Sequence, residues 1–238
     1  MAFVVNIKKD NKMQSIIKPI AYAKNDFKEK FGIPRQSGRA PSVITRIVFE
    51  PEYRIYDALR GIEDFSHLWL IFDFSLSHRK DFSPLVRPPR LGGNEKIGVF
   101  ASRSPFRPNS LGLSSVKLIS IEETKNEGPV LIVSGADLMD GTPVYDVKPY
   151  LPFTDCHTDA VGGFADEKLS HTLNVIIPEE IKNKLPQDMI PAIIECLKDD
   201  PRPSYQDDGR VYGMRFGSYD VKFIVCGNNL TVTNINKV

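Results

Sequence analysis

The chain has 238 residues, of which 41% are apolar and 26% are charged, and its formal net charge is +1. This length can bury one large core or two small ones, and the near-neutral charge argues against a general attraction to nucleic acid, so any anion-binding surface must be local. The start MAFVVNIKKD lacks the features of a secretory signal, and no stretch approaches the roughly 20 apolar residues of a membrane span. We therefore expect a cytoplasmic protein with no membrane contact.

Strand patterns dominate residues 15–153. Val43–Phe49 is β-branched and alternating, and two similar runs, Ser115–Ile121 and Val130–Ala136, are separated by Asn126 and Gly128. Gly and Asn between two such runs are typical of a turn, so these runs predict a hairpin.

Two further segments complete this half of the chain. His67–Phe74 has apolar residues at both its odd and its even positions, which predicts a strand covered on both faces. Pro51–Gly61 is the one fair candidate for a helix. Strands at short spacing, broken by Gly and Pro, favour a barrel or sandwich over a doubly wound sheet. We predict a mainly β protein whose N-terminal domain, residues 15–158, is β-barrel-like.

The sequence pattern changes after about residue 165. TLNVIIP predicts a strand, and YDVKFIVCGNNLTVTNI predicts two strands around a Gly-Asn-Asn turn. An apolar stripe at i, i+3, i+4 and i+7 predicts an amphipathic helix between them, carried by Ile190, Ile193, Ile194 and Leu197. Residues 165–238 should therefore form a small α+β C-terminal domain.

Basic residues gather on the stretch VRPPRLGGNEKIGVFASRSPFRPN, Val86–Asn109. Prolines should hold both ends as stiff loops around a strand at about Ile97–Ser102. Stiff loops hold the guanidinium fork in place for bidentate contact with a carboxylate or phosphate, which favours an anion site. The alternative is that the arginines pair with surface carboxylates or stack on Phe100 and Phe106. The four arginines are Arg87, Arg90, Arg103 and Arg107.

Acidic residues gather on ADLMDGTPVYDVKPYLPF, Ala136–Phe153. Asp137, Asp140 and Asp146 either cap the backbone of a hairpin turn or accept hydrogen bonds from a ribose or an ammonium group of a ligand. A third polar loop, Phe31–Arg39, again combines Pro, Arg, Gln and Gly.

Several common motifs are absent. The sequence has no phosphate-cradling glycine loop, no GxSxG and no His/Asp spacing typical of a metal site, so we expect no metal. His67 is better explained as a core residue than as a ligand. The adjacent pair Cys156-His157 is compatible with a thiol nucleophile, but an incidental thiol explains it better.

Six segments, in this order, resemble the TsaA-like (TrmO) family of tRNA methyltransferases. They are EKFGIPRQ, FSHLWLIF, VRPPRLGGN, GVFASRSPFRPN, DLMDGTPVYDVKPYLPF and DPRPSY, and they extend over nearly the whole chain. The resemblance implies a β-barrel enzyme that uses S-adenosylmethionine without a Rossmann fold and methylates N6 of threonylcarbamoyl-adenosine beside the anticodon (t6A to m6t6A). It also implies a homodimer with the cofactor near the subunit interface. The cofactor contacts that it implies are Pro34, Arg35, Gln36, Phe74, Ser75, Arg103, Asp137, Leu138, Met139 and Asp140.

The chemistry of this reaction suggests further roles. The urea-like N–H of the acceptor is a poor nucleophile until its proton is removed, so a carboxylate should act as general base, with Asp146 and Asp140 as candidates. The carboxylate of the modified base and the tRNA phosphates need cations, and unpaired bases need stacking partners. The predicted substrate contacts are Arg87, Arg90, Arg107, Tyr145, Arg202 and Tyr205.

Two other functions fit the same residues. A non-catalytic RNA-binding module would bind an anticodon loop through the charges of the arginines and through stacking on the aromatic residues. An enzyme for a small phosphorylated metabolite would use the arginine loops and leave the C-terminal domain without a role. The composition of the C-terminal domain predicts that it holds tRNA and not the cofactor, with DPRPSY either contacting RNA or merely ending the helix.

Overall fold

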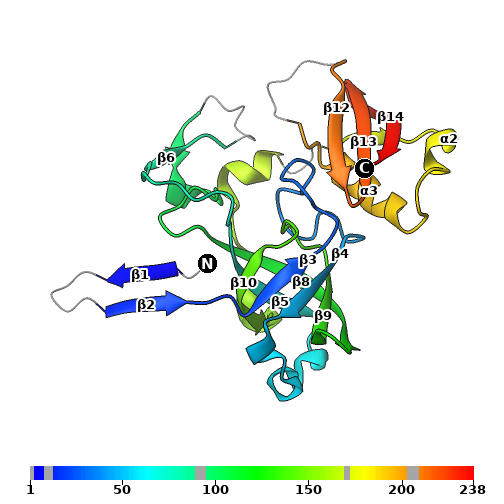
Figure 1. Cartoon of the computed structure of the whole chain (residues 1–238). Coiled ribbons are helices and arrows are strands. Elements are labelled where there is room, and N and C mark those ends of the chain that lie inside the picture. The colour runs from blue at the N-terminus through cyan, green and yellow to red at the C-terminus, as the bar shows by residue number, and fades with distance from the viewer. Residues whose placement is uncertain (1–2, 8–12, 89–94, 169–171, 203–208) are drawn as a thin grey trace.

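The computed structural model describes residues 3–7, 13–88, 95–168, 172–202 and 209–238. Six antiparallel strands pair in the order β10-β3-β4-β9-β8-β5, and β5 pairs with β10, so the sheet closes into a barrel (Figure 1). A mainly β fold is therefore confirmed. The six strands are β3 (Ala21–Lys24), β4 (Ile44–Phe49), β5 (His67–Asp73), β8 (Leu111–Thr124), β9 (Gly128–Ser134) and β10 (Pro143–Pro149).

Alternating residues of these strands fill the inside of the barrel. On β5, Leu68 and Leu70 are fully buried, whereas Trp69 and Ile71 on the opposite face are only half-buried. The prediction that this strand is covered on both faces is therefore wrong, because the described residues leave part of its outer side exposed. The strand that is covered on both faces is β9, which is buried from Pro129 to its end.

The predicted helix at Pro51–Gly61 is replaced by two short 3-10 turns, and a third turn follows them. These turns are η1 (Pro51–Tyr53), η2 (Tyr56–Leu59) and η3 (Ile62–Asp64). Gly61 lies in the left-handed region at φ 85°, which no continuous α-helix allows, and the side chain of Arg54 donates to the carbonyl of Phe49 at 2.8 Å. The segment therefore folds as separate turns against the barrel and not as one helix.

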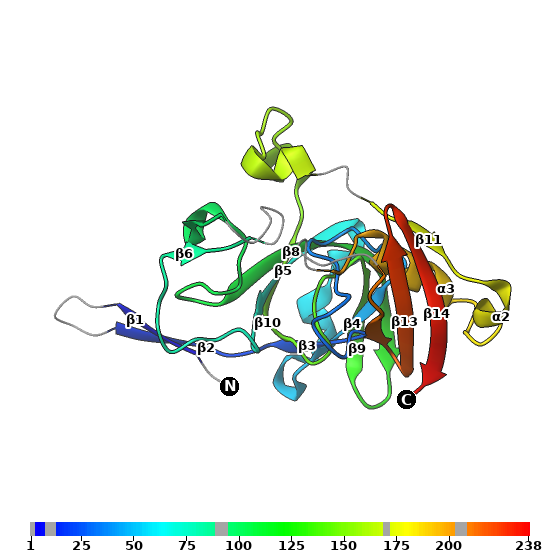
Figure 2. The same cartoon turned by 90° about the horizontal axis from the view of Figure 1, so that it is seen from above.

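A long connection, Phe74–Ser110, leaves the barrel between β5 and β8, and we call it the excursion. It contains β6 (Leu85–Val86), β7 (Ile97–Gly98) and the 3-10 turn η5 (Val99–Ala101). The strand predicted at Ile97–Ser102 is thus confirmed only at its first two residues, because the chain turns at Val99, where Ser102 Oγ donates back to the Val99 carbonyl at 2.9 Å. In both views the excursion stands beside the barrel and away from the C-terminal unit (Figures 1 and 2).

The C-terminal unit has four strands in the order β11-β14-β13-β12, with β11 parallel to β14. The predicted stripe lies on α3, where Ile193 and Leu197 are fully buried, while Ile190 and Ile194 pack at the edge of the same core. The α+β character of this unit is therefore confirmed. Its elements are β11 (Asn174–Ile176), α2 (Glu179–Lys182), α3 (Met189–Lys198), β12 (Tyr212–Phe216), β13 (Tyr219–Cys226) and β14 (Asn229–Lys237).

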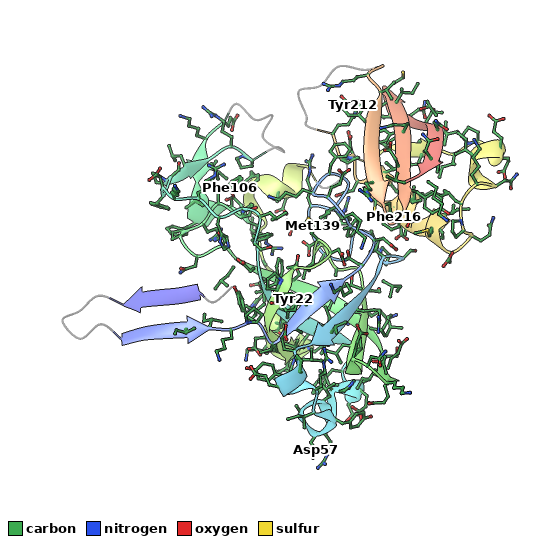
Figure 3. The ribbon with its side chains drawn as sticks, in the orientation of Figure 1. Tyr22, Asp57, Phe106, Met139, Tyr212 and Phe216 are labelled. Atoms are coloured by element: carbon green, nitrogen blue, oxygen red, sulfur yellow. The ribbon has the colours of Figure 1, made fainter. Side chains whose placement is uncertain are left out.

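The core of the C-terminal unit includes side chains from the barrel half of the chain. Phe27, Ala40 and Val43, from the loop between β3 and β4, are buried in the same cluster as Phe216. The rings of Phe27 and Phe216 meet edge to face, with centroids 5.7 Å apart. Figure 3 shows Phe216 on the side of the C-terminal sheet that faces the barrel. The β3–β4 loop is therefore part of the core of the C-terminal unit, while the inside of the barrel forms a separate apolar cluster.

The remaining elements lie outside these two units. β1 (Phe3–Ile7) and β2 (Met13–Ile17) form a hairpin that extends away from the barrel (Figures 1 and 2). The helix α1 (Pro152–Asp155) and the 3-10 turn η6 (Gly163–Lys168) follow the barrel. Among the described residues, no helix is long and apolar enough to cross a membrane.

Candidate cofactor and substrate site

Three loops meet at one end of the barrel. Ile44 at the start of β4 pairs with Ser134 at the end of β9, and Val144 at the start of β10 pairs with Phe72 near the end of β5. Paired residues lie side by side, so the connections at these strand ends share one end of the barrel. The three connections are the β3–β4 loop (Asn25–Val43), the excursion and the β9–β10 turn (Gly135–Thr142).

The β3–β4 loop runs directly against the β9–β10 turn. The amide of Gly38 donates to the carbonyl of Gly135 at 2.8 Å, and the amide of Gly135 donates to that of Val43 at 3.1 Å. A Cβ on Gly135 would lie 3.2 Å from the Cα of Gly38, and the φ of Gly135 is +76°, which L side chains rarely adopt. Glycine at residue 135 thus allows two backbones to touch.

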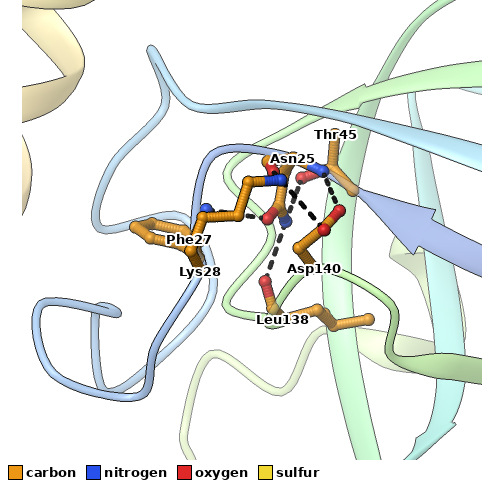
Figure 4. A network of polar contacts seen from close by, with 6 residues as sticks. All are labelled: Asn25, Phe27, Lys28, Thr45, Leu138 and Asp140. Carbon is orange, nitrogen blue, oxygen red and sulfur yellow. Dashed lines mark hydrogen bonds and ion pairs between the residues drawn. The ribbon is translucent and has the colours of Figure 1, made fainter. Parts of the chain in front are cut away.

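A second set of bonds ties the other end of the loop to the same turn (Figure 4). The Asn25 amide donates to Asp140 Oδ1 at 3.1 Å, and Asn25 Nδ2 donates to the Leu138 carbonyl at 2.8 Å. Lys28 Nζ lies 2.9 Å from Asp140 Oδ2. Both carboxylate oxygens of Asp140 are therefore engaged in holding the loop.

This network changes the acidity of Asp140. Partial burial alone would raise its pKa, but the bonds from Lys28 and the Asn25 amide outweigh burial, and the pKa lies below its ordinary value. A carboxylate with a lowered pKa and two engaged oxygens is a weak base. The contacts of Asp140 therefore give it a structural role, although it binds the backbone of the β3–β4 loop and not that of its own hairpin turn.

Three predicted cofactor residues converge from the three loops. Arg103 of the excursion donates through Nη1 to Gln36 Oε1 of the β3–β4 loop at 2.5 Å. Asp137 of the β9–β10 turn accepts from Ser114 Oγ of β8 at 2.5 Å and from the backbone of Ser37, and the charge of Arg103 acts on it. A guanidinium, an amide and a carboxylate thus lie together at the barrel end.

The carboxyl group of Asp137 is held in a poorly hydrated position. Burial raises its pKa above the ordinary value, and the bonds from Ser114 and Ser37 and the charge of Arg103 offset only part of that effect. A half-buried carboxyl group with a raised pKa beside a cluster of donors is a common feature of ligand sites. Ser37 and Ser114 were missed by the sequence analysis, since a serine that supports a neighbouring carboxylate has no sequence signature.

The other predicted cofactor residues surround this group. Pro34 and Leu138 are buried, while Arg35 and Met139 are half-buried. Figure 3 places Met139 at the barrel end that faces both the excursion, marked by Phe106, and the C-terminal unit, marked by Phe216.

Phe74 and Ser75 begin the excursion at the end of β5. The ring of Phe74 packs edge to face on Phe72, with centroids 5.0 Å apart, and Ser75 is half-buried. Lys30 of the β3–β4 loop donates to the Leu76 carbonyl at 2.7 Å and to Ser77 Oγ at 3.0 Å. The start of the excursion is therefore tied to the loop that carries Gln36.

The four arginines of the excursion have different environments. Arg107 donates to the carbonyls of Ser102 at 2.6 Å and Val99 at 3.2 Å and lies over the ring of Phe100, so it holds the shape of its own loop. Arg103 and Arg87 are exposed, and Arg90 lies outside the described residues. The stacking alternative holds for Arg107. Phe106 is covered by Arg79, which the sequence analysis did not consider.

Comparison with known proteins identifies the family of this chain. The model of the tRNA-methyltransferase O N-terminal domain matches residues 22–156, and the model of the TrmO C-terminal domain matches residues 170–238. The chain belongs to the TrmO family. It is 38% identical over 216 residues to the tRNA (adenine(37)-N6)-methyltransferase of Escherichia coli, which covers 87% of this chain and 91% of that protein.

Two more TrmO-family comparisons agree. The chain is 51% identical over 162 residues to the tRNA (adenine(37)-N6)-methyltransferase of Eikenella corrodens, covering 67% of this chain and 90% of that protein. The crystal structure of TrmO from Pseudomonas aeruginosa superposes with a TM-score of 0.78 at 34% identity, over 97% of this chain and 100% of that one. The resemblance found in the sequence is therefore confirmed.

Strand β10, within the matched N-terminal domain, carries Tyr145 and Asp146. Asp146 is 43% exposed in its side chain, lies 2.9 Å from Lys148 Nζ and pairs with Ile71 at a bulge. Tyr145 is buried, and burial, followed by the negative charge of Asp73, raises the pKa of its hydroxyl. Asp146 Oδ1 also accepts from the Val147 amide at 2.9 Å, so both of its oxygens are engaged, as they are in Asp140. Its side chain is nevertheless more exposed than that of Asp140, at 43% against 26%.

An acid–imidazole pair at the end of β5 was missed by the sequence analysis. Asp73 is only 3% exposed, and its Oδ1 lies 2.7 Å from His78 Nε2. The signal was the Asp and His in FDFSLSH, but a five-residue spacing has no regular geometry, so only the fold brings the two side chains together.

The TrmO C-terminal domain carries two of the predicted tRNA contacts, Arg202 and Tyr205. Arg202 donates through Nε and Nη2 to Asp200 at 3.0 and 3.1 Å, and its side chain is 11% exposed. Its carbonyl accepts from Arg35 Nη2 at 2.9 Å. Tyr205 lies outside the described residues. Arg202 thus contacts the β3–β4 loop, a link that the sequence analysis did not predict.

A metal site and a reactive thiol are two further kinds of chemistry to consider. Within the described ranges, no set of three His, Cys, Asp or Glu side chains is placed to hold a metal ion. Cys156 is exposed after α1.

Proposed function

We propose that this chain transfers a methyl group from S-adenosylmethionine to N6 of threonylcarbamoyl-adenosine at position 37 of tRNA, converting t6A to m6t6A. Membership of the TrmO family supports the reaction class. The observation that carries the location is the convergence of Gln36, Arg103 and Asp137 from three loops at one barrel end.

The groups at this barrel end suit S-adenosylmethionine. The exposed guanidinium of Arg103 matches a carboxylate, and the oxygens of Gln36 and Asp137 match ribose hydroxyls or an ammonium group. Apolar surface for an adenine ring and a thioether chain would come from Pro34, Phe74, Leu138 and Met139. Arg35 and Ser75 adjoin them, and Asp140 fixes the turn beneath. When bound, the cofactor supplies an electrophilic methyl group.

The chain's own residues must orient the acceptor and remove its proton. Fixing the reacting atoms in line supplies much of the rate of such a transfer, and loops tied at both ends are suited to that task. We favour Asp146 as the general base over Asp140, because Asp146 is more exposed and Asp140 holds the β3–β4 loop. The Asp146→Asn variant should then lose most methylation while binding S-adenosylmethionine normally, and Asp140→Asn should keep the larger share.

For the tRNA, we propose contacts along the excursion and the C-terminal unit. Arg87 is exposed, and within the described residues it has no bond to another side chain, which suits a phosphate contact. Arg90 and Tyr205 remain proposals from sequence. Arg107, Tyr145 and Arg202 also remain proposed contacts, although their intramolecular contacts favour indirect roles.

We further propose a homodimer. The outer face of β8 exposes Leu111 at 39% and Leu113 at 56%, and Trp69 and Ile71 on the neighbouring β5 are half-buried. Adjacent exposed apolar side chains on a sheet are a common feature of protein interfaces. Sedimentation of the wild-type chain and of Leu113→Asp tests this proposal, which predicts a dimer and a monomer, respectively.

The decisive experiment measures the reaction itself. Purified chain, S-adenosylmethionine and tRNA bearing t6A are incubated, and the nucleosides are resolved by mass; we expect m6t6A, and none from tRNA lacking the threonylcarbamoyl group. A non-catalytic RNA-binding module would bind tRNA without binding S-adenosylmethionine in equilibrium dialysis. An enzyme of a small phosphorylated metabolite would bind neither tRNA nor S-adenosylmethionine.

A further inference from the structure

We infer that the carboxyl-terminal end of α3 is part of the cofactor site's scaffold, and that Asp199 is a positioning residue for Gln36. This inference rests on the proposed binding of S-adenosylmethionine beside Gln36. It assigns to the C-terminal unit a role in cofactor binding, whereas the sequence analysis expected this unit to serve tRNA alone.

Asp199 binds the β3–β4 loop on both sides of Gln36. Its Oδ1 accepts from Arg39, 2.8 Å from Nε and 2.7 Å from Nη2, and its Oδ2 lies 3.4 Å from the amide of Arg35. The side chain of Asp199 is 6% exposed. Arg39 is 31% exposed, so the pair is partly buried. Water screens such a pair less than a fully exposed one, and this contact should therefore hold the loop more firmly than an exposed pair would.

Three further bonds come from the same end of α3 and the turn after it. Glu195 accepts from the Ser42 amide at 2.7 Å and from Ser42 Oγ at 2.8 Å. The guanidinium of Arg35 donates to the carbonyl of Arg202. Residues 35–42 are therefore bound by the C-terminal unit at several points.

The opposite side of the same short segment contacts the barrel and the candidate site. Gly38 bonds to Gly135, Ser37 bonds to Asp137, and Gln36 accepts from Arg103. Gln36 thus accepts from the guanidinium of the excursion, while a carboxylate of the C-terminal unit binds Arg35 and Arg39 on either side of it. Releasing Asp199 would free the loop on one side and move the Gln36 amide relative to Arg103 and Asp137.

The test compares Asp199→Asn with Glu29→Gln, both made in the full-length chain. Glu29 Oε1 accepts from the Arg215 amide at 2.9 Å, so it also joins the β3–β4 loop to the C-terminal unit, but it is exposed and its bond lies outside residues 35–42. We expect Asp199→Asn to raise the Kd for S-adenosylmethionine about tenfold, at a temperature where both variants are folded. Glu29→Gln should leave the Kd unchanged.

A double-mutant cycle separates positioning from general destabilisation. If Asp199 acts through Gln36, then Asp199→Asn should have little further effect on the Kd in a Gln36→Ala background. Fully additive effects, or an unchanged Kd in Asp199→Asn, would overturn the inference. Failure of the wild-type chain to bind S-adenosylmethionine would overturn the proposed function together with the inference.

Discussion

The β3–β4 loop and the excursion leave the same end of the barrel, yet they are held in opposite ways. The β3–β4 loop buries Phe27, Ala40 and Val43 and is bonded to both the β9–β10 turn and the C-terminal unit. The excursion is stabilised largely from within, as by Arg107 on its own carbonyls, and it exposes 72% of Phe100.

This difference separates two tasks. A loop fixed on both sides can present groups to a small ligand with little reorganisation, which suits cofactor binding. A segment that is less constrained by the rest of the molecule, and that exposes cations and aromatic rings, suits a large substrate or a second subunit. The two segments are joined where Lys30 binds the start of the excursion and, at the candidate site, where Arg103 reaches from the excursion to Gln36.

The largest expected effect comes from removing the apolar anchor of the β3–β4 loop. Phe27 is 1% exposed and packs on Phe216, so Phe27→Ala should lower the free energy of unfolding by about 4 kcal/mol. Phe100→Ala on the excursion should change it by less than about 0.5 kcal/mol. Chemical denaturation measures both, and equal losses would remove the distinction between the two segments.

The bridge between the segments gives the next largest effect. Arg103→Ala should lower kcat/KM for methylation by about 100-fold without changing the melting temperature, because Arg103 is exposed and its bond to Gln36 lies at the candidate site. The matched control is Arg60→Ala, an exposed arginine paired with Asp57 on η2. Normal turnover by the Arg103 variant would exclude this residue from the site.

The polar anchor of the β3–β4 loop predicts a dependence on pH. The pKa of Asp140 is lowered in the folded chain, so its ionised form stabilises the fold above the unfolded pKa, and this contribution disappears as the pH falls through the folded value. Asp140→Asn should cost about 1 kcal/mol at neutral pH, and the difference from wild type should shrink below about pH 4. Asp57→Asn, at an exposed pair, is the control. A difference that is constant with pH would contradict this account.

The smallest effect is expected on the excursion's outer surface. Arg87→Ala should raise the KM for tRNA a few-fold and reduce the salt dependence of binding by about one unit of slope, with S-adenosylmethionine affinity unchanged. Filter binding over a series of salt concentrations measures the slope. A change in cofactor affinity instead would place Arg87 with the β3–β4 loop.

The strand pattern was predictable where apolar alternation and turn residues agreed. Val43–Phe49, the hairpin of β8 and β9, and the stripe on α3 all follow local periodicity. The three 3-10 turns after Pro51 were not predictable as such, because a short apolar run has the same composition whether it forms one helix or several turns.

The candidate site was predictable as a set of loops but not as a set of contacts. Gln36, Arg103 and Asp137 were identified through family motifs, and the fold brings them together. The bonds of Arg35 to Arg202 and of Asp199 to Arg39 join residues more than 150 positions apart. Nothing in the local sequence specifies such pairs, so the participation of the C-terminal unit could not be inferred before the structure.

The burial of the β3–β4 loop in the C-terminal core also has a consequence for synthesis on the ribosome. Glu29 and Arg215, which bond across the two units, are 186 residues apart. At ordinary elongation rates the second emerges about 10 to 40 s after the first. During that interval the barrel can close, but Phe27 and its apolar neighbours Phe31 and Ile33 have no partner unit to cover them. The nascent chain therefore exposes an apolar segment until late in translation. A chaperone that recognises apolar loops would be expected to bind there.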